Sequence, residues 1–330
     1  MNSVRIALVV ALVLALALGA CGSKKSSSGP TGATGASVNL SVTEAGKAAK
    51  YTVPKGIKGG LATLTLTNQG KAPHSGQLAR IDGDHTAQEA LKVIAAQSNK
   101  TPAWLRAEGG IGAVAPGQTA NASMILEPGK YLVVDEGGPG SSAPPGYAEF
   151  TVTGKTPGSL PGTPTTITAA SDGKDKYRWE ISGTLKSGTQ QVTFVSKGKE
   201  ALHLIAGFRL NGNASKAQIL KALESEAAKP PKFVDQTSFY STAVIDGDKS
   251  QVTPLSLRSP GRWVLFCPLT DRDGGKEHFK EGLLKVVEVG EYESAPRGRA
   301  GAGRGPGTSR AARPRPGTGR SPRRRAGRRR

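Results

Sequence analysis

Between residues 37 and 290 the chain alternates short apolar runs with clusters of Gly, Pro, Asn and Lys. Runs rich in β-branched and aromatic residues, bounded by such turn-forming residues, are typical of strands. Pro128-Gly129 and Pro260-Gly261 each form a turn signal directly before another apolar run. The pattern therefore predicts a mainly β protein with strands at 61–67, 165–169 and 191–195, among others.

The pattern occurs twice along the chain. Residues 62–94 align with residues 191–223, and this places His74 opposite His203. Each copy also ends on a predicted strand, Tyr147–Val152 in the first and Leu283–Val289 in the second. Two copies of about 120 residues each match the usual size of a domain.

A single helix is expected inside each copy. Each helix begins with a capping box, in which a hydroxyl caps the third backbone N–H and the Glu or Gln three residues later reaches back. The boxes are Thr86 to Glu89 and Ser215 to Gln218. Apolar residues three positions apart predict the buried stripe of each helix; they are Leu91 with Ile94 and Leu220 with Leu223.

Residues 1–20 have the features of an export signal, with Arg5 followed by an apolar run from Ile6 to Leu18. The run is shorter than the about 20 residues of a membrane-spanning helix. It ends in Leu-Gly-Ala-Cys21, which resembles the lipobox of bacterial lipoproteins. That resemblance implies cleavage before Cys21, lipidation of its thiol and attachment to the extracytoplasmic face of the cell membrane. An ordinary secretory signal with an incidental cysteine is the alternative.

The mature chain is expected to divide into five parts. Residues 21–36 are rich in Gly, Ser and Thr and predict a flexible stalk. The two β-domains are then expected at 37–153 and 164–290, joined by a Gly- and Pro-containing linker at 154–163. Residues 291–330 consist mostly of Ala, Arg, Gly and Pro and predict a disordered tail.

The order of strands, His, Pro-Gly turn, Cys and His in the two copies resembles the cupredoxin family. The resemblance implies two tandem Greek-key β-sandwiches, each with one inserted helix. It also implies copper as a cofactor of the second domain, because His203, Cys267 and His278 occupy the three strong ligand positions. A thiolate with two imidazoles is the donor set of a blue-copper centre.

Two features depart from the family pattern. The weak axial Met position carries Leu283, which is compatible with three-coordinate copper. Ten residues separate Cys267 from His278, and the polar run around Asp271, Asp273 and the following glycines predicts a mobile loop that orients a ligand poorly.

The first copy lacks the ligand set, because Asp135 stands at the position of Cys267 and the following loop has no His. His74 is therefore expected to have a structural role. The same alternative applies to the second copy, where His203 and His278 can be packing residues and Cys267 a small core residue in a metal-free fold. His85, before the first helix, is expected at the solvated surface.

The formal net charge of +20 is concentrated in the tail. Residues 291–330 hold 13 Arg and two Glu, whereas residues 21–290 carry a net charge of only +8. The tail is either an out-of-frame or read-through extension or a polycationic arm that contacts anionic lipid or cell-wall polymer. Nucleic acid is not an expected partner, because the export signal removes the protein from it.

No motif indicates an enzyme. The chain has no Gly-rich phosphate loop after a strand, no His-Glu-x-x-His and no Gly-x-Ser-x-Gly. The sequence thus predicts a lipid-anchored, non-enzymatic binding or interaction module of the cell envelope. The alternative function is copper binding, with electron transfer, in the second domain.

Overall fold

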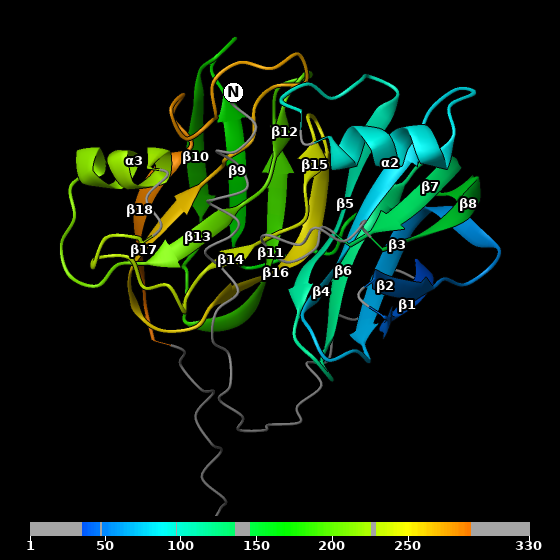
Figure 1. Ribbon diagram of the computed structural model, residues 1–330, viewed down its shortest axis with the longest axis horizontal. Helices are drawn as coiled ribbons and strands as arrows, with labels where there is room; N and C mark the ends of the chain where they lie inside the picture. The colour runs from blue at the N-terminus through cyan, green and yellow to red at the C-terminus, as the bar shows by residue number, and fades with distance from the viewer. Residues whose placement is uncertain (1–34, 47, 97, 136–145, 226–228, 292–330) are drawn as a thin grey trace, which may run out of the picture. The chain divides into compact units, whose positions relative to one another are not determined.

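The computed structural model describes residues 35–46, 48–96, 98–135, 146–225 and 229–291. Within these ranges the chain is mainly β, with two helices (Figure 1), as the hydrophobic pattern predicts. No helix among them is long and apolar enough to cross a membrane. The export signal, Cys21 and the Arg-rich tail from residue 292 onward lie outside the described residues.

The first half, residues 35–156, is a continuous series of paired strands. β3 is central, because it pairs in parallel with β1 and β8 and antiparallel with β6. The series continues from β8 through β7 and β4 to β5. The strands are β1 (Ala36–Ala45), β2 (Ala48–Thr52), β3 (Ile57–Asn68), β4 (His74–Ile81), β5 (Leu105–Val114), β6 (Thr119–Leu126), β7 (Gly129–Val134) and β8 (Tyr147–Thr156).

The second half, residues 157–291, forms two sheets that share a core. The first is one end of a 14-stranded sheet, in which β10-β9-β11-β16 continue into β6 of the first half, and the second is a four-stranded sheet with the order β14-β13-β17-β18. Trp179 and Phe194 of the first sheet belong to the same buried cluster as Trp263 and Leu265 of the second. The strands are β9 (Thr166–Ser171), β10 (Tyr177–Ser182), β11 (Gly188–Ser196), β12 (Leu202–His203), β13 (Ala206–Arg209), β14 (Tyr240–Ser241), β15 (Ile245–Asp246), β16 (Ser250–Leu257), β17 (Gly261–Phe266) and β18 (Leu284–Val289).

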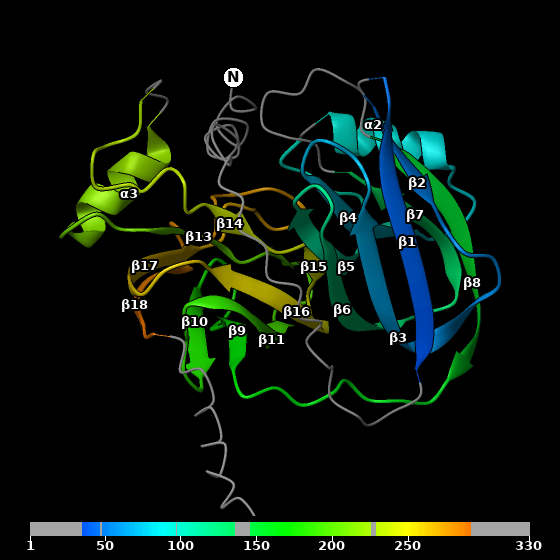
Figure 2. The ribbon, with the colours of Figure 1, turned by 90° about the horizontal axis from the view of Figure 1, so that it is seen from below.

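The strand pairing continues from one half into the other. β16 pairs with β6 (Figure 2), where Gln251 lies opposite Met124. At a second point, Ile245 of β15 lies opposite Glu108 of β5. Backbone hydrogen bonds therefore join the two halves at both pairings, and the N–H of Thr101 also donates to the carbonyl of Arg272 at 2.7 Å.

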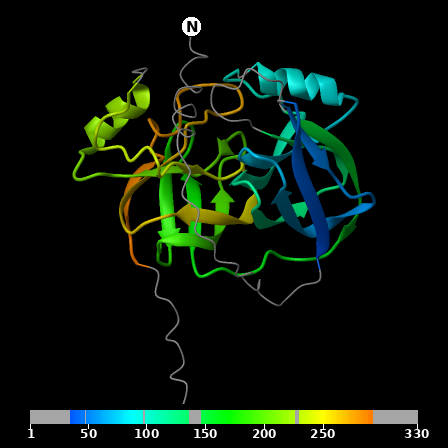
Figure 3. The same cartoon turned by 60° about the horizontal axis from the view of Figure 1, so that its bottom comes forward.

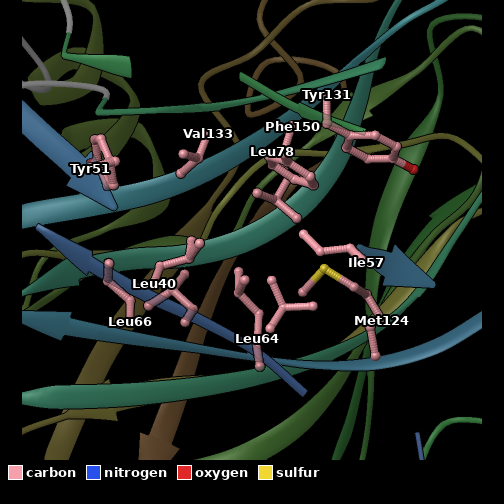
Figure 4. Close-up of a cluster of buried hydrophobic side chains, with 14 of the residues drawn as sticks. Leu40, Tyr51, Ile57, Leu64, Leu66, Leu78, Met124, Tyr131, Val133 and Phe150 are labelled. Atoms are coloured by element: carbon pink, nitrogen blue, oxygen red, sulfur yellow. The ribbon is translucent and has the colours of Figure 1, made fainter. Parts of the chain in front are cut away.

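The core of the first half consists of residues that alternate along its strands. Figure 4 shows Leu64 and Met124 among the labelled side chains, and the Tyr131 ring stacks on Phe150 at 5.2 Å. All four are buried. Residues i and i+2 of a strand share a face, so the period of two in the sequence creates this core.

Both capping boxes are present, at the two predicted positions. α2 (Ala87–Ala95) follows Thr86 and α3 (Lys216–Glu224) follows Ser215. α3 lies beside β13 and β17, whereas α2 covers residues of β4, β5 and β7 (Figure 3).

The predicted helix stripes are correct only in part. Leu223 is buried, whereas Leu91, Ile94 and Leu220 are half-buried. The fully buried helix residues are Ala90 and Ile219, one position away from the predicted stripes.

One predicted boundary also shifts. The first three residues of the expected linker, 154–156, belong to β8, which extends to Thr156. β8 pairs in parallel with β3 up to that residue, and this pairing keeps the chain extended beyond the predicted end of the strand.

Candidate metal centre

The alternation of side chains along β17 places Cys267 in the core. Trp263, Leu265 and Cys267 belong to the cluster between the two sheets, whereas Val264 and Phe266 face the cluster that α3 covers. Successive residues of a strand point to opposite faces, so Cys267 continues the inner row one residue beyond β17. It is a fully buried free cysteine.

His278 lies against Cys267 because the intervening loop returns to the end of β17. The N–H of Phe279 donates to the carbonyl of Cys267 at 2.9 Å, and the N–H of His278 donates to Leu269 at 2.8 Å. The His278 Nδ1 atom is then 3.6 Å from the Cys267 sulfur. Its Nε2 atom lies 3.2 Å from the Asp271 carboxylate.

His203 is placed on β12, beside the other two predicted ligands. Its ring centroid is 4.7 Å from that of His278. Its Nδ1 atom bonds the Ser196 hydroxyl at 2.8 Å, and its Nε2 atom is buried without a hydrogen-bond partner among the described residues. The structure therefore brings His203, Cys267 and His278 into one buried group.

Tyr177 contacts both imidazoles. Its ring lies 5.1 Å from that of His203 and 4.6 Å from that of His278. Its hydroxyl donates to Asp271 at 2.6 Å, so the same carboxylate holds Tyr177 and His278. Sequence reasoning missed Tyr177 and Ser196, because nothing near either residue in the chain marks it as a neighbour of a histidine.

The two histidines differ in charge. Burial and, to a smaller extent, the nearby positive charge of His278 lower the pKa of His203 to about 3, so its imidazole is neutral. Burial also acts to lower the pKa of His278, but hydrogen bonds to Asp271 and Cys267 outweigh it and raise this pKa to about 9. Burial opposes ionisation of Asp271, yet the hydrogen bonds from His278 and Tyr177 lower its pKa overall.

The loop between Cys267 and His278 is attached to its surroundings, contrary to the prediction of mobility. The Arg272 side chain is buried, and it donates to the carbonyls of Pro102 and Leu105 in the first half, both at 2.9 Å. The Thr270 hydroxyl donates to the carbonyl of Asn99 at 3.1 Å. The prediction was wrong because polar side chains can satisfy their hydrogen bonds with solvent or with backbone carbonyl groups. Here the carbonyl groups of the first half are the acceptors.

Leu283, at the position of the weak axial ligand, is fully buried in the same core cluster. Its carbonyl accepts from the N–H of Cys267 at 3.1 Å, and its N–H donates to His278 at 2.8 Å. Its side chain adds no donor atom to the site.

The three side chains fit a soft metal in two respects. In zinc sites, bonds of about 2.3 Å to sulfur and about 2.0 Å to nitrogen separate the two donor atoms by about 3.5 to 3.7 Å; the Cys267–His278 pair has this separation. His203 adds a buried nitrogen without a partner, while Ser196 holds its other nitrogen. Ligating histidines commonly have their second nitrogen held in this way.

The fit is nevertheless incomplete. Among the described residues, no group of three or more His, Cys, Asp or Glu side chains is already arranged to hold a metal ion. The side chains instead form a hydrogen-bonded group, in which His278 bridges Cys267 and Asp271. A metal that used all three ligands would have to displace the proton that His278 directs at the sulfur.

The corresponding position of the first half holds a histidine that is hydrogen-bonded to two carboxylates. His74 Nδ1 lies 2.8 Å from Asp135, and His74 Nε2 lies 3.1 Å from Glu44. The two carboxylates contact opposite edges of the ring, which suits a structural clamp. His85 is 40% exposed and stacks on Trp104 at 4.0 Å, consistent with the expected surface position.

No protein-family model matches this chain, and no curated protein matches it. Among solved structures, a multicopper oxidase is 14% identical over 77% of this chain and 88% of its own, with a TM-score of 0.21. Reduced auracyanin from Roseiflexus castenholzii is 27% identical over 39% of this chain and 98% of its own, with a TM-score of 0.26. Auracyanin A, a blue copper protein from Chloroflexus aurantiacus, is 17% identical over 36% of this chain and 99% of its own, with a TM-score of 0.25. TM-scores this low assign neither a fold family nor a function.

Proposed function

We propose that the second half binds one copper ion through Cys267, His278 and His203, and that the protein is a non-enzymatic copper or electron carrier of the cell envelope. The observation that carries the proposal is the 3.6 Å separation of Cys267 sulfur and His278 Nδ1 inside a fully buried group. A thiolate with two imidazoles selects copper by the softness of its donors. Bound copper would supply a one-electron redox couple.

The surrounding residues have roles that follow from their contacts. Ser196 fixes the His203 ring by its Nδ1 atom and leaves Nε2 as the free donor. Asp271 fixes the His278 ring by its Nε2 atom, which leaves Nδ1 directed at the sulfur. The apolar cluster around Cys267 excludes water from the thiol.

The proposal is tested by adding Cu(II) to the full chain carrying Cys21→Ala. The chain has two cysteines, so this background leaves Cys267 as the single thiol. We expect one equivalent of copper and an intense thiolate-to-copper absorption that a further Cys267→Ser substitution abolishes. No colour and no stoichiometric copper would contradict the proposal.

A metal-free binding module is the second candidate. The observation that favours it is that His203 Nδ1 and both nitrogens of His278 already have partners without a metal. On this account the three residues stabilise the core in the way that His74 and Asp135 stabilise the first half. The same titration separates the two candidates, since this one predicts no bound copper.

For the fold, we propose two tandem cupredoxin-like Greek-key β-sandwiches, at 37–153 and 164–290. In support, each half combines parallel and antiparallel pairing with one capped helix. Limited proteolysis at the 154–163 linker, followed by separate unfolding transitions of the two fragments, would support this division. A single transition without a stable fragment would contradict it.

For localisation, we propose that lipidated Cys21 anchors the protein at the extracytoplasmic face and that the Arg-rich tail contacts anionic envelope polymers. In the producing bacterium, Cys21→Ala should release the protein from the membrane fraction. Removing residues 291–330 should reduce salt-sensitive binding to anionic vesicles. Retention of the Cys21→Ala protein would contradict the anchor, and unchanged vesicle binding would contradict the role of the tail.

A further inference from the structure

The polar residues between Cys267 and His278 face two different directions. The side chains of Thr270 and Arg272 contact the first half, whereas Asp271 between them contacts His278 and Tyr177. Asp271 and Arg272 are consecutive residues, with Asp271 in an isolated β-bridge to Gly274 and Arg272 in the turn between them. Any displacement of Arg272 is therefore transmitted directly to the carboxylate that orients His278.

Arg272 is held by partners from the first half and from β15 through both terminal nitrogens of its guanidinium, whereas its buried Nε atom has no hydrogen-bond partner among the described residues. Its guanidinium donates to the carbonyls of Pro102 and Leu105 and pairs with the fully buried Asp246. Its backbone carbonyl accepts from the N–H of Thr101 at 2.7 Å. A planar guanidinium can serve three acceptors at fixed angles, which a lysine cannot.

Asp246 extends this contact back to the first half. It also pairs with Arg106 of β5, whose Nε atom is 2.8 Å from its carboxylate. Arg106, Asp246 and Arg272 thus form a row of three charged side chains across the junction between the halves. Asp246 is the shared partner of both arginines, so its removal would leave the buried Arg272 without a counter-charge.

The strand that carries His203 is attached to the first half by the same segment. Ile245, the neighbour of Asp246, lies opposite His203 of β12 on one side and opposite Glu108 of β5 on the other. A single segment therefore connects each histidine of the candidate site to the first half. For His203 this segment is β15, and for His278 it is the loop that carries Arg272.

We propose that the first half is the positioning scaffold of the site in the second half, and that Arg272 is the positioning residue through which it holds His278 against Cys267. This inference rests on the proposed function only in calling the two histidines ligands. The first half lacks the ligand set itself, but its loop at residues 99–105 supplies the acceptors that fix Arg272.

The test uses the metal-free full chain in the Cys21→Ala background, with the thiol of Cys267 as the probe. Because Cys267 is fully buried, a disulfide reagent modifies it only after an opening of the loop or of the whole protein. In Arg272→Gln we expect the modification rate to rise by about tenfold or more, because charged hydrogen bonds that close the loop are lost. Arg262→Gln is the matched control, since Arg262 pairs with Glu288 and Asn213 within the second half.

The urea dependence of the rate separates a local from a global effect. Local opening of the loop exposes little surface, so the Arg272→Gln rate should be nearly independent of urea well below the unfolding midpoint. Arg272→Lys retains the positive charge but lacks the planar guanidinium. Its rate of Cys267 modification should therefore lie between those of the wild type and Arg272→Gln. An unchanged rate, or a rise with the full urea dependence of global unfolding, would overturn the proposal.

If Arg272→Gln does not fold, Arg106→Gln decides the question by the same readout, because Arg106 is partly exposed and loses only its pairing with Asp246 and an exposed hydrogen bond to the Ala103 carbonyl. A wild-type protein that binds no copper contradicts the proposed function but leaves this test intact, since it uses the metal-free chain. In a copper-binding wild type, Arg272→Gln should also shift the thiolate-to-copper absorption, whereas Arg262→Gln should not.

Discussion

His74 Nδ1 lies 2.8 Å from the carboxylate of Asp135, at the position where the second half has Cys267. The two copies thus use the same location differently. In the first, a histidine is fixed between two carboxylates; in the second, a buried thiol faces an imidazole. The first copy shows how this location contributes to stability when no thiol is present.

Replacing His74 should destabilise the protein without affecting metal binding. In His74→Ala the buried carboxylate of Asp135 loses its hydrogen bond to the His74 ring and the ring leaves a cavity, so we expect the free energy of unfolding to fall by about 3 kcal/mol. Urea denaturation measures the loss. Copper stoichiometry should remain that of the wild type, and a loss of copper binding in a folded His74→Ala protein would place the site in the wrong half.

The acid stability of the first half should depend on Glu44. Backbone hydrogen bonds from Ala72 and Lys71, together with His74, lower the pKa of Glu44 from 4.5 to about 2. Because the folded-state pKa lies below the unfolded value, this stabilisation is complete above pH 4.5 and is lost as the pH falls from 4.5 towards 2.

Glu44→Gln should therefore show a smaller loss of stability than the wild type over that pH range, as measured by urea midpoints at a series of pH values. The exposed Glu149 provides the charge-matched control, Glu149→Gln. Parallel pH profiles for Glu44→Gln and the wild type would show that Glu44 does not carry this stabilisation.

Gly282, immediately before Leu283, should not tolerate a side chain. A Cβ atom there would lie 1.8 Å from the carbonyl oxygen of Tyr177, whereas a Cβ at Gly275 would meet nothing within 4 Å. Both glycines have φ near +120°, so the backbone strain of an alanine is similar at the two positions.

We expect Gly275→Ala to cost about 1 kcal/mol from this strain and Gly282→Ala to cost about 3 kcal/mol or more, because the backbone of Tyr177 must also move. Thermal unfolding of the two variants gives the comparison. Equal losses would show that the close approach to Tyr177 is unimportant.

A methionine at the axial position should alter bound copper but not the fold. Leu283→Met conserves volume and should change the free energy of unfolding by less than about 1.5 kcal/mol. An axial donor raises the coordination number, which favours Cu(II) over the three-coordinate Cu(I) state, so the reduction potential should fall relative to the wild type. Leu265→Met, in the same core cluster, is the control and should leave the potential unchanged. Identical potentials for Leu283→Met and the wild type would argue against an axial position at residue 283.

The sequence predicted those parts of the fold that have local signals. Thr86 and Ser215 marked the helices because capping boxes act within four residues, and Pro260-Gly261 marked β17 because turns are equally local. His203, Cys267 and His278 were predicted as a group and do lie together.

The contacts between the two halves could not be predicted in this way. Arg272 lies in a run of aspartates and glycines that is typical of a solvated loop, yet its acceptors at Pro102 and Leu105 lie about 170 positions earlier in the chain. Ser196 and His203, which share a hydrogen bond, lie closer together in the sequence. No local sequence pattern, however, marks a serine as the partner of a histidine. Both features depend on tertiary packing and not on a local preference.

X-ray absorption at the copper edge, on the full chain with Cys21→Ala and one equivalent of copper, tests the central claim most directly. We predict one sulfur and two imidazole nitrogens around the metal, with the sulfur lost in Cys267→Ser and one imidazole lost in His203→Ala. A coordination shell of nitrogen and oxygen alone, unchanged by Cys267→Ser, would contradict the account.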